Sequence, residues 1–315
     1  MLPGPVKRSE HRGSGNAGLI NKYCSFMEDY SMGWLHDRPD FRDFDAGSTE
    51  IRPLVDQVKG LEKNGALPLR HDVSKFCSPI EDQRTLGSCT AQAGVALMEY
   101  FVNRSQTGEQ FDGSRLFLYK VTRNLLGWTG DRGAFLRTTM GAMKLFGVPP
   151  ERYYRYEIAQ YDQEPEAFLY SLAQNFKAEK YFRLDPGDTD PKTVLKNIKQ
   201  YLYAGFPSMF GFTVYSSYLQ ASNNDGKLPF PSTTNESAKG GHAVVAVGYD
   251  DEMEITNTFD GSKTKGALKI RNSWGAGWGQ KGYGWLPYKY VLERQAVDFW
   301  TMISIKYVES GHFGI

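Results

Sequence analysis

The hydrophobic pattern of this chain changes character at about residue 180, and this change limits the folds available to it. Before that point, apolar residues recur at spacings of three and four, as in Ala91, Val95, Met98 and Val102, which is typical of an amphipathic helix. After it, short runs rich in β-branched and aromatic residues alternate with turn residues. A chain that is helical first and β-rich later predicts an α+β fold with two lobes.

The expected elements follow from this spacing and from the capping and turn residues that flank it. We expect helices beginning near 89 and 114, helices over 134–146 and 168–176, a helix from 190 to about 202, and weak helical spacing over 51–63. Strands are expected over 208–215, 242–249, 267–271, 283–285 and 298–307, with polar loops over 216–239 and 251–265.

The N-terminal part of the chain lacks the pattern of either lobe. Residues 1–20 are rich in glycine, proline and charge, so we expect them to be disordered. Residues 30–45 mix aromatics with charges and show no period, which predicts an extended arm held down by Trp34, Phe41 and Phe44. We therefore expect a leader and arm over 1–66, a mainly helical lobe over 67–180 and a β-rich lobe over 181–315.

Composition excludes several classes of function. The formal net charge is +1, which gives no argument for a nucleic-acid or anionic-membrane partner. No run approaches the roughly 20 apolar residues of a membrane span, and no signal peptide is visible, so we expect a protein that is cytoplasmic or exported by another route. The chain has no zinc-ligand spacing and no phosphate-binding glycine loop, so we expect no metal and no cofactor.

Cys89 is one of three cysteines and stands in an unusual context. It follows Gly87 and Ser88 and opens the first helical run, with Ser88 as the candidate N-cap. A helix N-terminus favours the thiolate, which is the nucleophilic form of cysteine. The alternative is a small buried residue among alanines. If Cys89 is free, Cys24 and Cys77 are the two that could pair, and the sequence leaves their redox state open.

His242 is the histidine best placed to work with a nucleophile. It follows two glycines and opens an apolar strand in AKGGHAVVAVGYD, where a ring at the strand edge can face a second lobe. Asn272 follows another strand and begins the segment NSWGAGWGQKGYGW. A carboxamide can accept a hydrogen bond from an imidazole and fix its tautomer, while Trp274 could shield that bond from water. The alternatives are a structural histidine and a glycine-rich turn packed with aromatic rings.

Taken together, these segments resemble the papain-like cysteine proteases, in which the same motifs occur in the same order. The motifs are Gln-x4-Ser-Cys from Gln83 to Cys89, Gly-His-Ala around His242, and Asn-Ser-Trp-Gly from Asn272. The resemblance covers about residue 67 to the C-terminus. It implies a two-lobe fold, a helical lobe facing a β-barrel-like lobe with the active-site cleft between them.

The resemblance also implies the chemistry. Cys89 would be the nucleophile, His242 the general acid and base, Asn272 its orienting residue and Gln83 an oxyanion donor. The expected reaction is hydrolysis of a peptide or protein substrate through a thioester. By position relative to the family, the substrate would be bound by Gly87, Ser88, Gly133, Phe212, Ala243 and Trp274.

The chain departs from the family pattern beside the nucleophile and at its N-terminus. Leu86 and Thr90 replace a cysteine and an aromatic residue of the papain signature. The long helical pro-segment of family zymogens is absent; the shorter stretch GWLHDRPDFRDF resembles the leader of bacterial and archaeal members. Our hypothesis is that residues 30–50 lie against the cleft or one lobe as a lid or short pro-segment, the alternative being a plain structural arm.

Two other functions fit part of the pattern. A transglutaminase-like or amide-cleaving enzyme shares the Cys-His logic but generally uses aspartate as the orienting residue. A binding protein on an inactive protease scaffold is the second, although every catalytic position is filled. Peptide preference, endopeptidase or exopeptidase action, oligomeric state and biological target cannot be read from the sequence.

Overall fold

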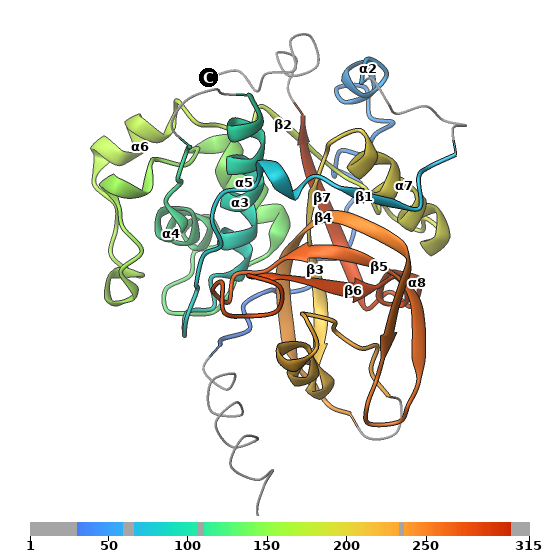
Figure 1. Cartoon of the computed structure of the whole chain (residues 1–315). Helices are drawn as coiled ribbons and strands as arrows, with labels where there is room; N and C mark the ends of the chain where they lie inside the picture. Colours follow the sequence, from blue (N-terminus) through green and yellow to red (C-terminus); the bar gives the residue numbers. More distant parts are fainter. Residues whose placement is uncertain (1–29, 59–65, 106–109, 233–235, 304–315) are drawn as a thin grey trace, which may run out of the picture.

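The computed structural model describes residues 30–58, 66–105, 110–232 and 236–303 (Figure 1). Helices α3 to α6 lie on one side of the molecule, and most of the strands lie on the other together with α2, α7 and α8, so the α+β class expected from the sequence is confirmed. The helices are α2 (Arg52–Val55), α3 (Cys89–Ser105), α4 (Arg115–Leu125), α5 (Leu136–Leu145), α6 (Ala167–Ala173), α7 (Pro191–Tyr203) and α8 (Tyr288–Leu292). The strands are β1 (Arg70–Asp72), β2 (Lys180–Arg183), β3 (Ser208–Tyr215), β4 (Ala238–Thr256), β5 (Lys263–Arg271), β6 (Tyr283–Pro287) and β7 (Ala296–Ile303). Short 3₁₀ turns are η1 (Ser74–Phe76), η2 (Glu151–Tyr153), η3 (Ile158–Gln160) and η4 (Ser216–Asn223).

Helix α3 is the central element of the helical part. Its residues from Cys89 to Val102 are all buried, because α3 packs on α4 and α5 and also on β3 and β4. A helix surrounded in this way buries all its faces rather than one stripe, and α3 therefore also buries the polar side chains of Gln92 and Glu99. The N-terminus of α3 is therefore fixed at the junction between the helices and the sheet.

The strands form one antiparallel sheet in the order β2-β7-β3-β4-β5-β6, with β1 paired to β4. In the β3–β4 register, Phe212 lies opposite His242, whereas Gly211 lies opposite Ala243 and Thr213 opposite Gly241. Because side chains alternate along a strand, Gly211 and Gly241 lie on one face and His242 on the other.

The structure corrects several expectations. Strands β4 and β5 extend through 251–265 as a hairpin, because charged and polar residues pair there at a solvent-facing edge; the loop prediction is wrong for most of that segment. Phe41 is 96% exposed and does not hold the arm down. The predicted strand 298–307 begins two residues earlier, and its end lies outside the described residues, as do residues 1–20 and Cys24.

The arm, defined here as residues 30–50, crosses the junction between helices and sheet. The Trp34 N–H donates to the Gly241 carbonyl at 3.0 Å, and the Ala134 N–H donates to the Gly33 carbonyl at 2.8 Å. Trp34 forms an isolated parallel bridge with Ala134. One short stretch of the arm therefore binds the backbone of both halves of the molecule.

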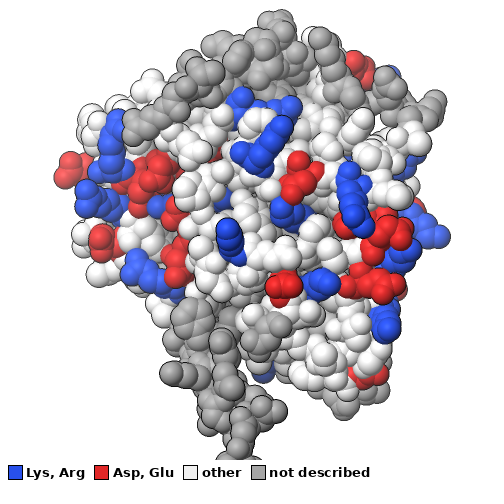
Figure 2. All heavy atoms as spheres, viewed as in Figure 1, with Lys and Arg blue, Asp and Glu red and all other residues white. Residues whose placement is uncertain are grey.

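Within the described part of the chain, no helix combines the length and the apolar character needed to cross a membrane. The same residues contain no group of three or more histidine, cysteine, aspartate or glutamate side chains able to hold a metal ion. Figure 2 shows one face of the molecule, on which positive and negative side chains are interspersed, in keeping with the net charge of +1.

Candidate active site

Cys89 is the first residue of α3, as the sequence predicted from the apolar spacing that follows it. The Gln92 N–H donates to the Ser88 carbonyl, which places Ser88 at the N-cap position, while the Ser88 hydroxyl lies 2.6 Å from the Tyr156 hydroxyl. The thiol is fully buried, and this burial raises its pKa to about 11. Backbone hydrogen bonding from Ala243 and Gly33 opposes that rise in pKa.

His242 is held by a hydrogen bond to Asn272. Ring atom Nε2 lies 2.8 Å from Asn272 Oδ1, which also accepts from the Ser273 N–H. Because an amide oxygen only accepts, Nε2 carries the ring proton and Nδ1 is the basic nitrogen. Nδ1 is buried and has no hydrogen-bond partner among the described residues.

Aromatic rings enclose the imidazole. The Trp274 ring stacks on it with centroids 4.5 Å apart, and the Phe212 ring meets it edge-on at 5.9 Å. Burial lowers the pKa of His242 to about 4, whereas the hydrogen bond that Nε2–H donates to Asn272 acts in the opposite direction. With the arm in place, the thiol and the imidazole are therefore both neutral at pH 7.

Gln83 is fixed by its side-chain oxygen and presents its NH₂ group. Oε1 accepts from the Ser273 hydroxyl at 2.7 Å, and Nε2 donates to the carbonyls of Leu86 at 3.1 Å and Ser31 at 2.9 Å. A bridge between Asp82 and Trp274 holds this segment against the one that carries Asn272. The amide therefore aims a donor at a carbonyl oxygen of the arm.

Gly87 and Gly133 line the path of the arm backbone. A Cβ atom on Gly133, whose φ is +71°, would lie 2.1 Å from the Gly33 carbonyl oxygen. A Cβ atom on Gly33 would lie 1.8 Å from the Gly87 carbonyl oxygen. Glycine at all three positions permits this close approach of backbones.

Asp131, which the sequence analysis missed, fixes this path. Its carboxylate accepts from the Gly87 N–H at 3.0 and 3.1 Å and from the Tyr119 hydroxyl, which in turn accepts from the Gly133 N–H at 3.1 Å. A carboxylate two residues before a glycine in GDRG was the available signal. The Asp131 carboxylate links the two glycine segments into one rigid wall.

The remaining residues singled out from the sequence lie close to these. Ala243 is buried, and backbone hydrogen bonding from it lowers the pKa of the Cys89 thiol. Phe212 is buried against the rings of His242 and Tyr290, on the face of the sheet opposite Gly211. Trp274 is buried between His242 and Tyr30, whose rings lie on it at 4.5 and 5.3 Å.

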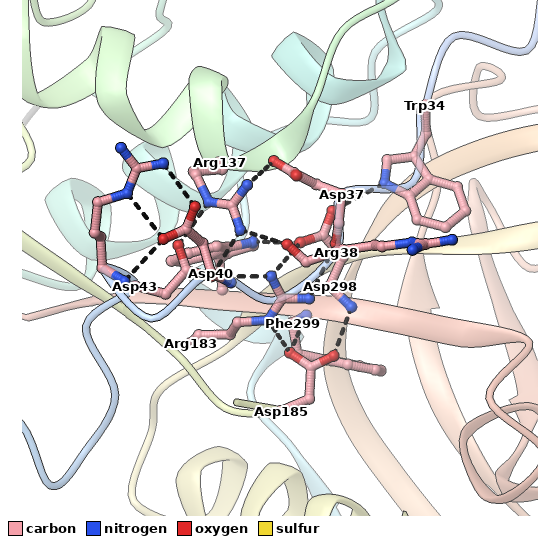
Figure 3. A network of polar contacts seen from close by, with 12 residues as sticks. Trp34, Asp37, Arg38, Asp40, Asp43, Arg137, Arg183, Asp185, Asp298 and Phe299 are labelled. Atoms are coloured by element: carbon pink, nitrogen blue, oxygen red, sulfur yellow. Dashed lines mark hydrogen bonds and ion pairs between the residues drawn. The ribbon is translucent and has the colours of Figure 1, made fainter. Parts of the chain in front are cut away.

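A buried ion-pair network under the arm was also not predicted (Figure 3). Arg183, without exposure to solvent, pairs with Asp43 and Asp298 at 3.3 Å and with Asp185 at 3.0 Å. Arg137 of α5 pairs with Asp43 at 2.6 Å. A charged residue inside the apolar run AVDFWTM was the available signal for Asp298.

Comparison with known proteins identifies the family. The model of the papain family of cysteine proteases matches residues 67–295, so the chain belongs to this family. An uncharacterized peptidase C1-like protein of Acanthamoeba polyphaga mimivirus is 34% identical over 285 residues, which is 87% of each chain. Chymopapain of Carica papaya is 26% identical over 209 residues, or 65% of this chain and 50% of that protein.

A solved structure shows the same architecture. Xylellain, a cysteine protease from Xylella fastidiosa, shares 30% sequence identity with a TM-score of 0.68, covering 88% of this chain and 97% of that one. The papain-like two-lobe fold expected from the sequence is confirmed.

Proposed function

We propose that the protein is a cysteine peptidase that hydrolyses peptide bonds through a thioester, with Cys89, His242, Asn272 and Gln83 as its catalytic residues. The observation that carries this proposal is the tautomer of His242. Its Nε2 is bound to Asn272 at 2.8 Å, which leaves the basic Nδ1 for a proton donor, and backbone hydrogen bonding from Ala243, the next residue along β4, opposes the rise in the pKa of the Cys89 thiol.

The reaction follows from these groups. The thiol proton of Cys89 moves to Nδ1 of His242, and the sulfur forms a bond to the substrate carbonyl carbon. The carbonyl electron pair moves to oxygen, where Gln83 Nε2 and the Cys89 N–H donate to the negative charge. When the tetrahedral intermediate collapses, the C–N bond breaks and the amine leaves with the proton from Nδ1.

Water completes the cycle. Nδ1 removes a proton from a water molecule, whose oxygen attacks the thioester carbon. Collapse of the second intermediate breaks the C–S bond, releases the carboxylic acid and returns a proton to the sulfur. Asn272 and Trp274 keep the imidazole oriented throughout, by the hydrogen bond at 2.8 Å and the stacked ring at 4.5 Å.

We further propose that the arm keeps the enzyme inactive by filling the substrate site in the reverse direction. Tyr30 stacks on Trp274 and donates its hydroxyl hydrogen to the Trp274 carbonyl at 3.1 Å. Trp274 covers His242, which protonates the leaving amine, so Tyr30 lies on the leaving-group side. Trp34 lies beyond Gly33 on the acyl side, where a substrate has its N-terminal residues. The arm therefore runs opposite to a substrate and offers no peptide bond in the reactive polarity.

The experiment is hydrolysis of a fluorogenic peptide panel by the full-length Gly33→Ala variant, whose added Cβ would lie 1.8 Å from the Gly87 carbonyl oxygen in the docked arm, with Cys89→Ser and Cys77→Ser added to it as matched variants. We expect loss of hydrolysis for Cys89→Ser and retention for Cys77→Ser. An epoxysuccinyl peptide inhibitor should add mass to Cys89 alone. Labelling without hydrolysis of any peptide, or transfer of the acyl group to an added amine in preference to water, would contradict the peptidase assignment.

A further inference from the structure

The Trp34 side chain fills a pocket on the sheet, and the shape of the indole ring matches the shape of this pocket. The side chain is buried, and the pocket floor is the face of β3 and β4 that carries Gly211 and Gly241. A Cβ atom on Gly211 would lie 1.9 Å from the indole Cε2, and one on Gly241 would lie 2.6 Å from Cε3. Two residues without side chains therefore leave room for one large flat ring.

A buried carboxylate lies at the end of this pocket. The indole Nε1–H of Trp34 donates to Asp298 Oδ2 at 3.2 Å, while the Trp300 Nε1–H donates to Oδ1 at 2.7 Å (Figure 3). Asp298 has no solvent exposure and a φ of +67°, a conformation that non-glycine residues rarely adopt. Its N–H is fixed by the Asp185 carboxylate at 2.7 Å. The acceptor Oδ2 is thus held rigidly toward the ring site.

The charges around this carboxylate favour a neutral partner. Two arginines, Arg137 and Arg183, lie over the Trp300 ring at 6.0 and 5.2 Å. The arm contributes the carboxylates that pair with Arg137, so its departure removes them. Burial raises the pKa of Asp298 to about 7. Above that pH the pocket wall contains two cations and two anions, Asp185 and Asp298, and needs no further charge to balance it.

We propose that, after the arm departs, this pocket binds a tryptophan side chain on the acyl side of the substrate, and that Asp298 is the residue determining this specificity. The proposal rests on the peptidase function above, because it assumes that a peptide takes the place of the arm. Gly211 and Gly241 select a large flat ring, and Asp298 Oδ2 selects a ring that carries an N–H donor. A ring of equal size without the N–H would leave the buried Asp298 Oδ2 without a donor, and this lowers the affinity for such a ring.

The experiment compares two peptides that differ in one atom. One carries tryptophan, and the other carries 3-benzothienylalanine, in which sulfur replaces the indole N–H. Both are placed at each acyl-side position in turn. The full-length Gly33→Ala/Trp34→Ala variant is the parent protein for these measurements. Trp34→Ala empties the pocket, and the Cβ atom of Gly33→Ala is incompatible with the close approach of the arm to Gly87. Kd is measured with Cys89→Ala added to this parent, and kcat/KM is measured with Cys89 present.

At about pH 8, where Asp298 is ionised, we expect tryptophan to be preferred at one position by about 10- to 100-fold, as a hydrogen bond to a charged group implies. Asp298→Asn should bring the ratio near unity, because Trp300 and Arg183 retain the amide oxygen and the NH₂ group faces the indole N–H. Gly211→Ala tests shape independently: the three atoms nearest its added Cβ all belong to Trp34. It should weaken both ring peptides equally and favour leucine.

The outcomes separate the two proposals. Equal Kd values for the ring pair at every position, or a preference for arginine or lysine over tryptophan, would overturn the role of Asp298. If Asp298→Asn does not fold, an unchanged preference in Gly211→Ala overturns the pocket assignment. A tenfold Kd difference with no hydrolysis of any peptide would leave the pocket standing and refute the peptidase function.

Discussion

Gly33 is the arm residue at which a side chain would do most damage to the closed form. Its added Cβ would lie 1.8 Å from the Gly87 carbonyl oxygen and 2.8 Å from the Gly87 Cα, both of them backbone atoms that cannot rotate away. Contacts of real Cβ atoms lie at 3.0 Å or more, so the arm of a Gly33→Ala variant must retreat by about 1.2 Å.

That retreat would break the hydrogen bonds that hold the arm. The three backbone bonds around Gly33 and Trp34 measure 2.8, 3.0 and 3.1 Å, and an added displacement of this size takes them past the range of a hydrogen bond. Each contributes about 0.5–1.5 kcal/mol, so the loss is about 1.5–4.5 kcal/mol. The equilibrium between docked and displaced arm should shift about 10- to 1,000-fold toward displacement.

The assay is the rate constant for alkylation of Cys89 in the full-length chain, read by intact mass, together with the initial rate of peptide hydrolysis. Both should rise in Gly33→Ala within the range given above. Gly47→Ala is the matched control: it also lies in the arm, is exposed, and its added Cβ meets a single side-chain atom at 3.4 Å. Equal alkylation rates in folded wild type and Gly33→Ala would show that the arm does not restrict access to the thiol.

Three further results are expected. Because burial raises the pKa of Cys89 to about 11, the alkylation rate of the wild type should increase with pH up to that value. In Gly33→Ala, the inflection of the alkylation rate against pH should move to lower pH, because water reaches the sulfur. An inflection at the same pH in both proteins would contradict the burial argument. Added to Gly33→Ala, Gln83→Ala should lower kcat about 100- to 1,000-fold by removing an oxyanion donor, and a change below about threefold would exclude that role. Arg137→Gln removes two partly buried ion pairs that hold the arm, so it should speed alkylation of Cys89 about 3- to 10-fold. Arg42→Gln removes a solvent-exposed ion pair and should leave the alkylation rate unchanged. Identical effects of the two variants would show that Arg137 does not anchor the arm.

The helix that begins at Cys89 and the strand that carries His242 could be predicted because both depend on local patterns, although β4 begins at Ala238 rather than at His242. Spacing of apolar residues sets which face of an element is buried, and a small or capping residue sets where it starts. The four candidate catalytic residues could be named for a related reason, since their order and spacing resemble a family with distinctive motifs. Their roles remain proposals until the variants are measured.

The hairpin at 251–265 could not be predicted, because its paired strands are mostly polar on both faces. They lack the alternation of apolar and polar residues that distinguishes a strand from a loop. The burial of Arg183 and Asp298 was hidden for a different reason. A charged residue is stable in the core only when it is paired there, and two of the partners of Arg183 come from distant segments, Asp43 of the arm and Asp298 of β7. The residues next to a charged side chain in the sequence do not predict such a distant partner.

The sequence by itself determined most of the longer helices and strands and the identity of the thiol, imidazole and amides, because these depend on neighbouring residues. Tertiary structure alone decided which ring nitrogen of His242 is basic, which way the arm runs, and that an indole ends against Asp298. Each of these depends on a contact between segments far apart in the chain. Trp34 and Asp298, for example, are hydrogen-bonded although 264 positions separate them in the sequence.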